Sequence, residues 1–411
     1  MVLKNNQYQI QHIPVLNIVQ QHGSPLYVYD ANKIIEKINE LKSVFSTVNL
    51  KIKFACKALT NISILKLMRQ QGVELDVVSP QEMQLGLMAG YSGSQITFTP
   101  SGVSFDEIEA AVAQGSTVNL DNLSVLEKFG QQYGNTVGCS LRIKPNVAAG
   151  GNAKIMTAHE GSKFGIDVGQ KAQILDIIHK YDIQVIGIHQ HTGSDIKTPE
   201  AFVQVADIIF EFAHAFPNLQ FIDLGGGFKV AYKDGDVVTD MVALGQQLSS
   251  AFLDFCGQYG RPLQLWFEPG KFLVSECGHL FVTANVVKHN PTRTFVGVNS
   301  GLNHLIRPMM YDSYHDIVNV SNTELTKTET YDVVGYICET DTFAKDRTLP
   351  IVNEGDILAF KNAGAYGFTM SSQYNSRFRP AEVLVINGQA KVIRERETME
   401  DILGRQVMIE I

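Results

Sequence analysis

The sequence predicts an α/β protein in which a TIM-type (β/α)8 barrel is followed by an all-β domain, and three observations lead to this fold. The chain has 411 residues, of which 45% are hydrophobic and 18% are charged, so it is long enough for two domains and apolar enough to fold. From residue 51 to residue 268, short apolar runs alternate with longer amphipathic stretches. Beyond residue 276, strand-like runs follow one another with turn residues between them. Alternation of the first kind is typical of parallel strands joined by helices.

The barrel prediction depends on a set of regularly spaced candidate strands. The stretches between them carry apolar residues three and four positions apart, as expected of helices that cover a barrel. Ser104, with Glu107 three residues later, and Asp121 are typical helix-capping residues at the start of two of these stretches. Eight such units over roughly 220 residues match a closed barrel. The candidate strands are residues 51–56, 74–78, 95–99, 117–120, 138–144, 185–189, 220–224 and 264–268.

A β domain is predicted after the barrel because strand-like runs there are not separated by long helices. The N-terminal run Leu26–Tyr29 is expected to pair with this domain. We therefore predict a barrel over residues 31–275 and a β domain made of residues 1–30 and 276–411. The strand-like runs of the β domain are residues 279–287, 293–299, 331–338, 356–362 and 381–387.

Composition excludes several functional classes. The net charge of −8 gives none of the basic patches expected of a nucleic-acid-binding protein. The five cysteines are scattered and lack the spacing of zinc ligands, so we expect reduced thiols and no metal site. The N-terminal residues lack the apolar core of a signal peptide, and no run approaches the ~18 apolar residues of a membrane span. We expect a cytoplasmic protein that acts on a small molecule.

The candidate site residues follow the candidate strands, because the active site of such a barrel lies at the C-terminal ends of its strands. Lys57 follows the first strand, His191 and Ser194 follow the sixth, Gly225 to Gly227 follow the seventh, and Glu268 ends the eighth. Each residue also has an ordinary interpretation, such as a solvated lysine, a structural histidine or a tight glycine turn. Their convergence at one end of a barrel favours a binding site.

Together these residues match the requirements of pyridoxal 5'-phosphate (PLP). Successive glycine N–H groups bind an anion such as a phosphate, and barrels often hold phosphate after strands seven and eight. The Lys57 amine is able to form an imine with the cofactor, and the apolar Phe54 and Ala55 favour its neutral form. Glu268 is suited to pair with a protonated pyridine nitrogen. A barrel aldolase that uses Lys57 without PLP and a PLP carrier without turnover are the alternatives from other classes.

Further segments extend the pattern along nearly the whole chain. In order they are FACKA (54–58), DVVSPQE (76–82), SKFGI (162–166), HQHTGSD (189–195), DLGGGF (223–228), EPGK (268–271), GLNHLIRPMMY (301–311), GYICETD (335–341) and GAYGFTMSSQYNSRFRPAEVLV (364–385). This series resembles the diaminopimelate decarboxylase family. The resemblance implies an alanine-racemase-like fold, PLP as the cofactor, and decarboxylation of meso-2,6-diaminopimelate to L-lysine with release of CO2, the final step of bacterial lysine biosynthesis.

The resemblance also implies a role for each matching residue. By similarity, Lys57 forms the imine, Cys338 is the proton donor, and the β domain contributes to the active site and to the interface of a homodimer with shared sites. The segment with Cys338 and Glu339 would reach the active site of the partner subunit. The implied cofactor-binding residues are Lys57, His191, Ser194, Gly225, Gly226, Gly227, Glu268, Pro269, Gly270, Lys271 and Tyr366. The implied substrate-binding residues are Lys271, Arg307, Tyr311, Glu339 and Tyr366.

The chain departs from the family pattern at two positions, and one of them bears on the site. Lys271 stands where the family usually has arginine, and this replaces a planar bidentate donor with a point charge. Phe378 stands where proline is more usual, and we have no functional account of it. Residues 147–163 are either a lid or an ordinary surface loop.

Diaminopimelate is favoured over related substrates because it carries a carboxylate and an ammonium at its distal end. Arg307 is suited to pair with that carboxylate, and Glu339 with that ammonium. Ornithine, arginine and carboxynorspermidine decarboxylases and alanine racemase are the nearest rivals. Racemases of this fold resemble one another in placing arginine at the pyridine nitrogen, so Glu268 argues against racemization.

Overall fold

The structure is a computed structural model that describes residues 1–147, 159 and 161–411. The segment 147–163, predicted as a lid or a loop, therefore falls largely outside the described residues. The chain divides into two compact units. The barrel unit consists of residues 37–231 and 237–273, and the β unit consists of residues 1–36, 232–236 and 274–411.

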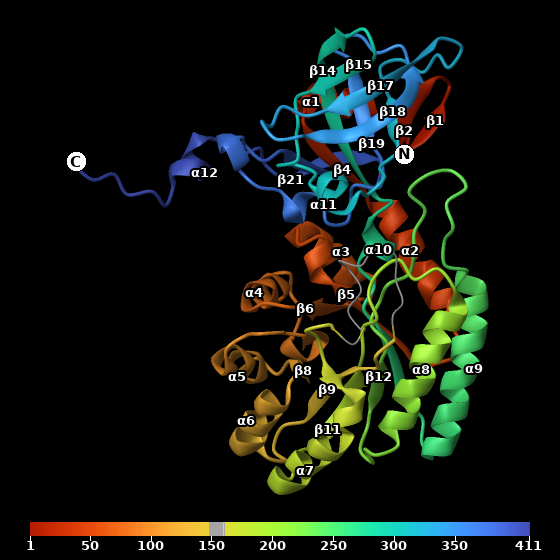
Figure 1. The fold of residues 1–411 in the computed structure, drawn as a ribbon, viewed down its shortest axis with the longest axis vertical. Helices are drawn as coiled ribbons and strands as arrows, with labels where there is room; N and C mark the ends of the chain where they lie inside the picture. The colour runs from red at the N-terminus through yellow and green to blue at the C-terminus, as the bar shows by residue number, and fades with distance from the viewer. Residues whose placement is uncertain (148–158, 160) are drawn as a thin grey trace. The chain divides into compact units, whose positions relative to one another are not determined.

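The barrel unit contains the closed parallel sheet that the sequence predicts (Figure 1). Among the described residues, each barrel strand pairs with the next one along the chain. The last strand also pairs with the first, which closes the sheet. Every predicted strand matches an observed strand to within one residue at either end, which confirms the predicted fold class. The barrel strands are β5 (Leu50–Ala55), β6 (Glu74–Val77), β7 (Ile96–Phe98), β8 (Thr117–Leu120), β9 (Cys139–Lys144), β11 (Val185–His189), β12 (Phe221–Asp223) and β13 (Gln264–Phe267). The short β10 (Ile166–Asp167) pairs with β9.

Helices follow the barrel strands and turn their apolar faces toward the sheet, as periods of three and four residues require. The capping box of Ser104 and Glu107 is present. The predicted cap at Asp121 is wrong by one residue, because the side chain of Asn122 accepts the N–H of Ser124 instead. The helices are α2 (Ala31–Val44), α3 (Ile62–Gln70), α4 (Pro80–Met88), α5 (Phe105–Ala113), α6 (Leu123–Tyr133), α7 (Lys171–Tyr181), α8 (Pro199–Ala213), α9 (Met241–Tyr259) and α10 (Lys271–Val274). Shorter 3-10 turns are η1 (Cys56–Ala58), η2 (Gly93–Gln95) and η4 (Val168–Gln170).

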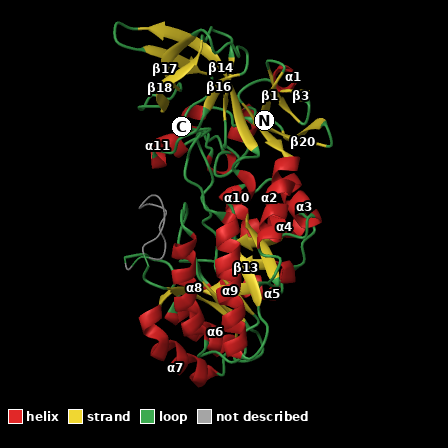
Figure 2. Ribbon diagram, turned by 90° about the vertical axis from the view of Figure 1, so that its right-hand side faces the viewer, coloured by secondary structure: helices red, strands yellow, loops and turns green. Residues whose placement is uncertain are grey.

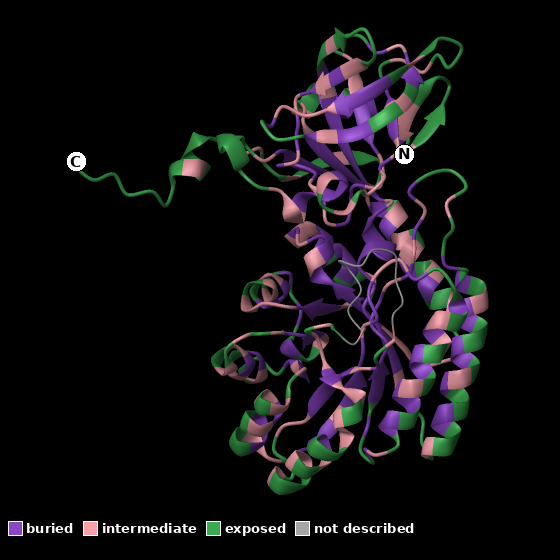
Figure 3. Cartoon of the chain, viewed as in Figure 1, coloured by how far each residue is buried: buried purple, intermediate pink, exposed green. Residues whose placement is uncertain are grey.

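The interior of the barrel is packed near the start of the strands. The rings of Phe221 and Trp266 stack with their centroids 3.5 Å apart. The buried Lys53 ammonium lies 4.1 Å from the centroid of the Trp266 ring and 2.7 Å from Glu74 Oε2. In Figure 3 the barrel strands are coloured as buried along most of their length. Because this end is filled, binding is left to the opposite end, where the strands terminate.

The β unit is built around the long strand β14 (Gly278–His289), and strands dominate it in Figure 2. The N-terminal strand β4 (Leu26–Asp30) pairs antiparallel with β14 and parallel with β20 (Ala381–Ile386). This pairing confirms the prediction that the β domain takes up the N-terminal run. Val28, Phe281 and Val383 from these strands lie in one apolar core.

Other strands of the β unit were predicted only in part. The predicted runs correspond to β14, β15 (Thr294–Val298), β17 (Thr328–Val334), β19 (Ile357–Phe360) and β20. The sequence analysis missed β1 (Val2–Lys4), β2 (Gln7–Ile10), β3 (Ile13–Pro14), β16 (Ile317–Asn319), β18 (Thr342–Pro350) and β21 (Gln389–Arg394). The unit also contains α1 (Val15–His22), α11 (Arg307–Tyr311), α12 (Met399–Leu403), η5 (Phe368–Met370) and η6 (Tyr374–Ser376).

Among the helices of the described residues, none combines the length and the apolar character that a membrane crossing needs.

Candidate active site

The predicted lysine stands at the mouth of the barrel. Lys57 lies in η1, directly after β5, and its side chain is 40% exposed. Its Nζ is 3.3 Å from Oδ2 of Asp76, a buried residue of β6. Burial, together with the negative charge of Glu268, raises the pKa of the Asp76 carboxyl to about 7. The Lys57 amine is thus reachable from solvent and held by a carboxylate on the neighbouring strand.

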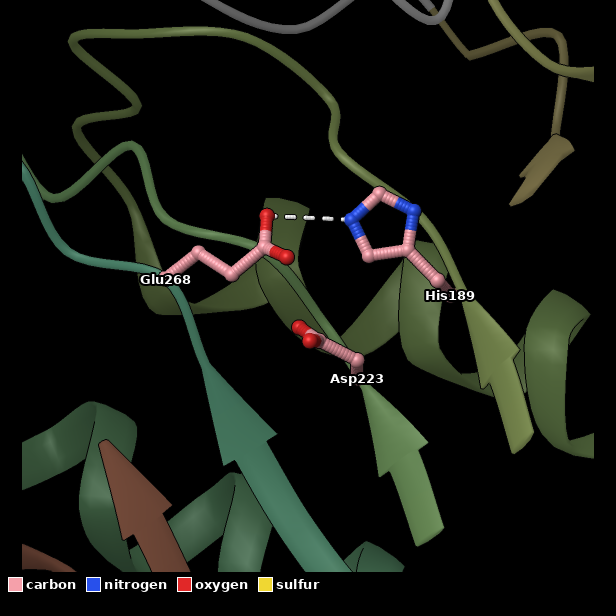
Figure 4. A group of neighbouring side chains, drawn as sticks. All are labelled: His189, Asp223 and Glu268. Carbon is pink, nitrogen blue, oxygen red and sulfur yellow. Dashed lines mark hydrogen bonds and ion pairs between the residues drawn. The ribbon is translucent and has the colours of Figure 1, made fainter. Parts of the chain in front are cut away.

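Glu268 lies deeper in the barrel, within a buried polar cluster that Figure 4 shows. His189 Nε2 is 3.0 Å from Glu268 Oε2, and Asp223 completes the group at the end of β12. One ligand atom from each of the three residues lies within 4.8 Å of the others. These residue types also bind metal ions, but here His189 Nε2 and Glu268 Oε2 contact each other at hydrogen-bond distance.

The protonation states of this cluster follow from burial and mutual contact. Burial lowers the pKa of His189, although Glu268 opposes the shift, so the imidazole is neutral at pH 7. Burial alone would raise the pKa of Glu268, but the interaction with His189 and the Lys57 charge hold this pKa well below its usual range. Glu268 is therefore a carboxylate, as expected of a group that meets a protonated ring nitrogen.

His191 is the second histidine at the end of β11, and it is half-buried. Its Nδ1 accepts the N–H of Gly226 at 3.2 Å. Burial and the positive charge of Arg142 lower the pKa of His191 to about 3, so the ring is neutral and able to accept this hydrogen bond. Its predicted stacking on a cofactor ring stays a prediction.

The glycine turn after β12 allows close backbone contacts. A Cβ on Gly226 would lie 2.4 Å from the backbone oxygen of Glu268, and one on Gly225 would lie 2.7 Å from the backbone oxygen of Gln190. Gly225 also has a positive φ of 68°, which favours glycine. Its N–H donates to Asp223 Oδ1 at 2.8 Å. The turn is therefore fixed to the same cluster as Glu268, and its predicted role as phosphate site with Gly227 and Ser194 is untested.

The EPGK segment connects the eighth strand to the first. The backbone oxygen of Pro269 accepts the N–H of Ala55 at 3.3 Å, two residues before Lys57. Pro269 and Gly270 are both buried. Lys271, at the start of α10, is buried as well, and its ammonium is 2.8 Å from Asp195 Oδ2. The sequence analysis did not foresee this ion pair.

The remaining predicted residues belong to the β unit. Arg307 is buried and donates to Tyr232 Oη at 3.4 Å and to Ser313 Oγ at 3.3 Å. Its guanidinium lies 5.9 Å from the centroid of the Tyr311 ring. Tyr366 is half-buried and has a positive φ of 56°. Arg307 and Tyr311 thus lie close together at the two ends of α11, and their role as a substrate clamp stays a prediction.

Cys338 and Glu339 lie on an exposed segment of the β unit. Cys338 is the exposed one among the free cysteines, and the other four are buried. Its Sγ is 3.5 Å from Glu339 Oε2 and 3.6 Å from Asn375 Nδ2. Tyr374 donates its hydroxyl to the other oxygen of Glu339. The thiol and the carboxylate thus form one exposed polar pair.

Several polar residues of the barrel mouth escaped the sequence analysis, namely Asp76, Arg142, His189, Asp195 and Asp223. Four of them stand at or near the end of a strand, so the signal was present in the sequence. The site residues predicted from the sequence mostly follow a strand, whereas His189 and Asp223 are the last residues within β11 and β12.

The residues of the barrel unit fit PLP. An accessible amine, a neutral imidazole, a glycine turn closed to side chains and a buried carboxylate come from successive strand ends. Glu268 Oε1 is buried and has no hydrogen-bond partner within the described residues, so it is left for an external donor such as a pyridinium N–H.

Comparisons with known proteins support this assignment. The family model of the pyridoxal-binding domain of pyridoxal-dependent decarboxylases matches residues 31–275. The diaminopimelate decarboxylase of Methanothermobacter thermautotrophicus is 37% identical over 95% of this chain and 93% of its own. That of Escherichia coli K12 is 35% identical over 96% of each chain.

A solved structure shows the same likeness. The crystal structure of diaminopimelate decarboxylase from Helicobacter pylori complexed with L-lysine is similar with a TM-score of 0.87 and 31% identity, covering 95% of this chain and 98% of that one. Similarity at this level over the full length shows that the proteins belong to one family, whereas a shared barrel alone would show only a common fold. The chain belongs to the diaminopimelate decarboxylases, a family of PLP-dependent carboxy-lyases.

Proposed function

We propose that this protein decarboxylates meso-2,6-diaminopimelate to L-lysine and CO2, the final step of lysine biosynthesis, with PLP held at the mouth of the barrel. The observation that carries the proposal is the buried carboxylate of Glu268, which is paired with His189 and has one oxygen able to accept from an external donor, since no described residue donates to it. A carboxylate at this point keeps a pyridine nitrogen protonated, as decarboxylation requires. The family membership supports the same reaction.

The barrel residues bind and orient the cofactor in this proposal. When bound, PLP supplies the electron sink that accepts the electron pair left behind by the departing carboxylate. Lys57 provides the amine that holds the cofactor covalently, and Asp76 Oδ2 lies 3.3 Å from its Nζ and orients it. Ser194 and Gly225 to Gly227 bind the phosphate, and His191 contacts the ring.

Residues of the β unit recognise the substrate and supply the proton. Arg307 pairs with the distal carboxylate through its planar fork, and its Nε is buried without a partner in the described residues. Tyr311 and Tyr366 line the same site, and Glu339 binds the distal ammonium. Cys338 gives a proton to the carbon that has lost CO2, and Glu339 is close enough to return one to the thiol.

The proposal includes a homodimer in which each active site borrows Cys338 and Glu339 from the partner subunit. Both residues are exposed in the single chain, as expected of groups that act in another copy's site. It also includes a cytoplasmic location, since all five cysteines are free thiols, as is usual in a reducing compartment.

A side-by-side assay tests the proposal. CO2 release is measured from meso-diaminopimelate, ornithine, arginine and carboxynorspermidine, together with a visible spectrum of the same sample. We expect a coloured protein that strongly prefers meso-diaminopimelate. Preference for any of the other three would overturn the substrate, turnover without colour would overturn the cofactor, and colour without turnover would indicate a PLP carrier.

A further inference from the structure

Two oxygens in the buried cluster of His189, Asp223 and Glu268 have no donor. Asp223 Oδ2 and Glu268 Oε1 are both buried and make no hydrogen bond within the described residues. Their partner oxygens are satisfied, because Asp223 Oδ1 accepts the N–H of Gly225 at 2.8 Å and Glu268 Oε2 contacts His189 Nε2 at 3.0 Å. Figure 4 shows the two carboxyl groups side by side. Buried polar atoms without partners are rare and call for an explanation.

Ionised carboxylates are acceptors only, so two of them cannot satisfy each other. Two buried carboxylates this close also repel, and such a pair retains one proton between its members. A single proton on Asp223 Oδ2, donated to one lone pair of Glu268 Oε1, would give both unpaired atoms a partner and would leave the second lone pair of Oε1 for a pyridinium N–H. The opposite arrangement would place the proton on Glu268. This is less favourable, because Glu268 already accepts a hydrogen bond from neutral His189 and accepts it better as an anion.

The charged surroundings favour the proton on Asp223. Burial, followed by the negative charge of Glu268, raises the pKa of Asp223 well above its usual value, whereas that of Glu268 is held low. Both residues are buried, with exposed fractions of 0% for Asp223 and 6% for Glu268. The other titratable or charged groups around the pair are Lys53, Lys57, Asp76, Arg142, His189 and His191.

We infer that Asp223 is a positioning residue that stays protonated at neutral pH and donates a hydrogen bond to Glu268, so that Glu268 is the anion of the cluster and is fixed from two sides. His189 holds one oxygen and Asp223 holds the other. Asp223 also holds Gly225 at the start of the glycine turn. It therefore connects the group proposed for the pyridine nitrogen to the turn proposed for the phosphate.

This inference deepens the proposed function and rests on its placement of PLP. Asp223 touches neither the cofactor nor the substrate in this account and acts through Glu268 and Gly225. Asparagine has the shape of a protonated aspartic acid, with one oxygen to accept and one N–H to donate. Asp223→Asn is therefore the conservative variant, whereas Asp223→Leu removes both functions at similar size.

Infrared spectroscopy reads the proton directly. The holoenzyme is prepared with and without isotope-labelled aspartate, and the carboxylic-acid C=O band that shifts with the label is recorded at pH 7. We expect such a band in the wild-type protein and its loss in Asp223→Asn. The same recording on protein stripped of cofactor shows whether the proton depends on PLP. If the Asp223→Asn spectrum kept every carboxylic-acid band of the wild-type spectrum, the inference would be overturned.

Cofactor release provides the functional readout. The PLP dissociation constant is measured for wild type, Asp223→Asn and Asp223→Leu, with Ser140→Ala as a control that removes another buried polar group of the barrel. We expect Asp223→Asn and Ser140→Ala to stay within about threefold of wild type, and Asp223→Leu to weaken PLP binding by about tenfold or more, the effect of losing a buried hydrogen bond.

The outcomes separate this inference from the proposed function. If Asp223 is ionised in the native protein, Asp223→Asn removes a charge and should weaken PLP binding as much as Asp223→Leu does, which would overturn the inference. A wild-type protein that binds no PLP would instead overturn the proposed function, and the infrared band would still report on the Asp223 proton. If Asp223→Leu does not fold, the infrared band and the PLP affinity of Asp223→Asn are sufficient to test the inference.

Discussion

The ammonium of Lys271 lies 2.8 Å from the Asp195 carboxylate, and both residues belong to the barrel unit. Lys271 is 7% exposed and Asp195 18% exposed at the side chain. Removing one partner of a pair this well buried leaves a charge without compensation, and this costs more than removing both. The pair therefore predicts strong energetic coupling between the two positions.

A double-mutant cycle in urea checks this coupling. Lys271→Met should lower the free energy of unfolding in the wild-type background by about 1 to 3 kcal/mol more than it does beside Asp195→Asn. The exposed pair of Lys180 and Glu127, also in the barrel unit and 2.9 Å apart, is the matched control and should show a coupling below about 1 kcal/mol. Equal coupling in the two cycles would contradict the prediction.

Lys57→Ala should abolish both the visible absorbance of bound PLP and the decarboxylase activity while leaving the fold intact. The reason is that the Lys57 amine is proposed to hold the cofactor, while its side chain is 40% exposed, so its loss should cost little stability. Absorbance, activity and circular dichroism are measured together, with the exposed Lys66→Ala on α3 as the control. A chromophore that persists in Lys57→Ala would mean that another lysine holds PLP.

The barrel could be predicted closely from the sequence, whereas the edges of the β unit could not. Barrel strands are buried on both faces, so they appear as short apolar runs. The missed strands β18 and β21 lie at the two ends of their sheet. Charged residues such as Lys345 and Lys391 interrupt them, as is common in edge strands, and no apolar run marks their position.

The site was predictable where a residue follows a strand and unpredictable where tertiary closure brings polar groups together. Lys57 and Glu268 could be found from their place after a strand. The cluster of His189, Asp223 and Glu268 depends on three strand ends that meet only because the barrel closes. The pairing of Lys271 with Asp195 likewise joins positions 76 residues apart. Roles that depend on a second subunit, as for Cys338, stay predictions.

The pH dependence of stability should report on Asp76. Its pKa is raised to about 7 in the folded chain by burial and by Glu268, while an unfolded aspartate titrates near ~3.9. The folded state therefore binds more protons between these values, and the free energy of unfolding falls as pH rises from about 4 to about 7. Urea denaturation of cofactor-free protein should show this contribution in wild type and its absence in Asp76→Asn.

His191 provides the opposite control for that measurement. Its pKa is lowered to about 3 by burial and by Arg142, so here the unfolded state binds more protons. In the wild type, neutral His191 therefore contributes to the free energy of unfolding, and this contribution is lost as pH falls from about 6.5 toward 3. His191→Asn should remove this pH dependence. If both variants changed the stability profile in the same direction, one of the two protonation states would be wrong.

Arg307→Gln should weaken recognition of the distal carboxylate. The guanidinium is buried and already fixed by Tyr232 and Ser313, so glutamine cannot reproduce its charged fork. We expect kcat/KM for meso-diaminopimelate to fall by about 100-fold, the effect of losing a buried charge-assisted contact of about 3 kcal/mol. L-lysine has only the carboxyl group that reacts and therefore no distal carboxylate. The kcat/KM for its slow decarboxylation should fall much less. Equal losses for both substrates would assign Arg307 a purely structural role.

Mixing two inactive variants tests whether the active sites are shared. Lys57→Ala supplies an intact Cys338, and Cys338→Ala supplies an intact Lys57. If Cys338 acts in the partner's site, each mixed dimer contains one complete site, so equal amounts of the two chains should recover about one quarter of wild-type activity after random exchange. Subunit exchange is verified by tagging one variant and purifying the mixed dimer. Verified mixed dimers without activity above that of either parent would show that Cys338 does not complete the neighbouring site, because every site in such a dimer would then lack one of the two residues.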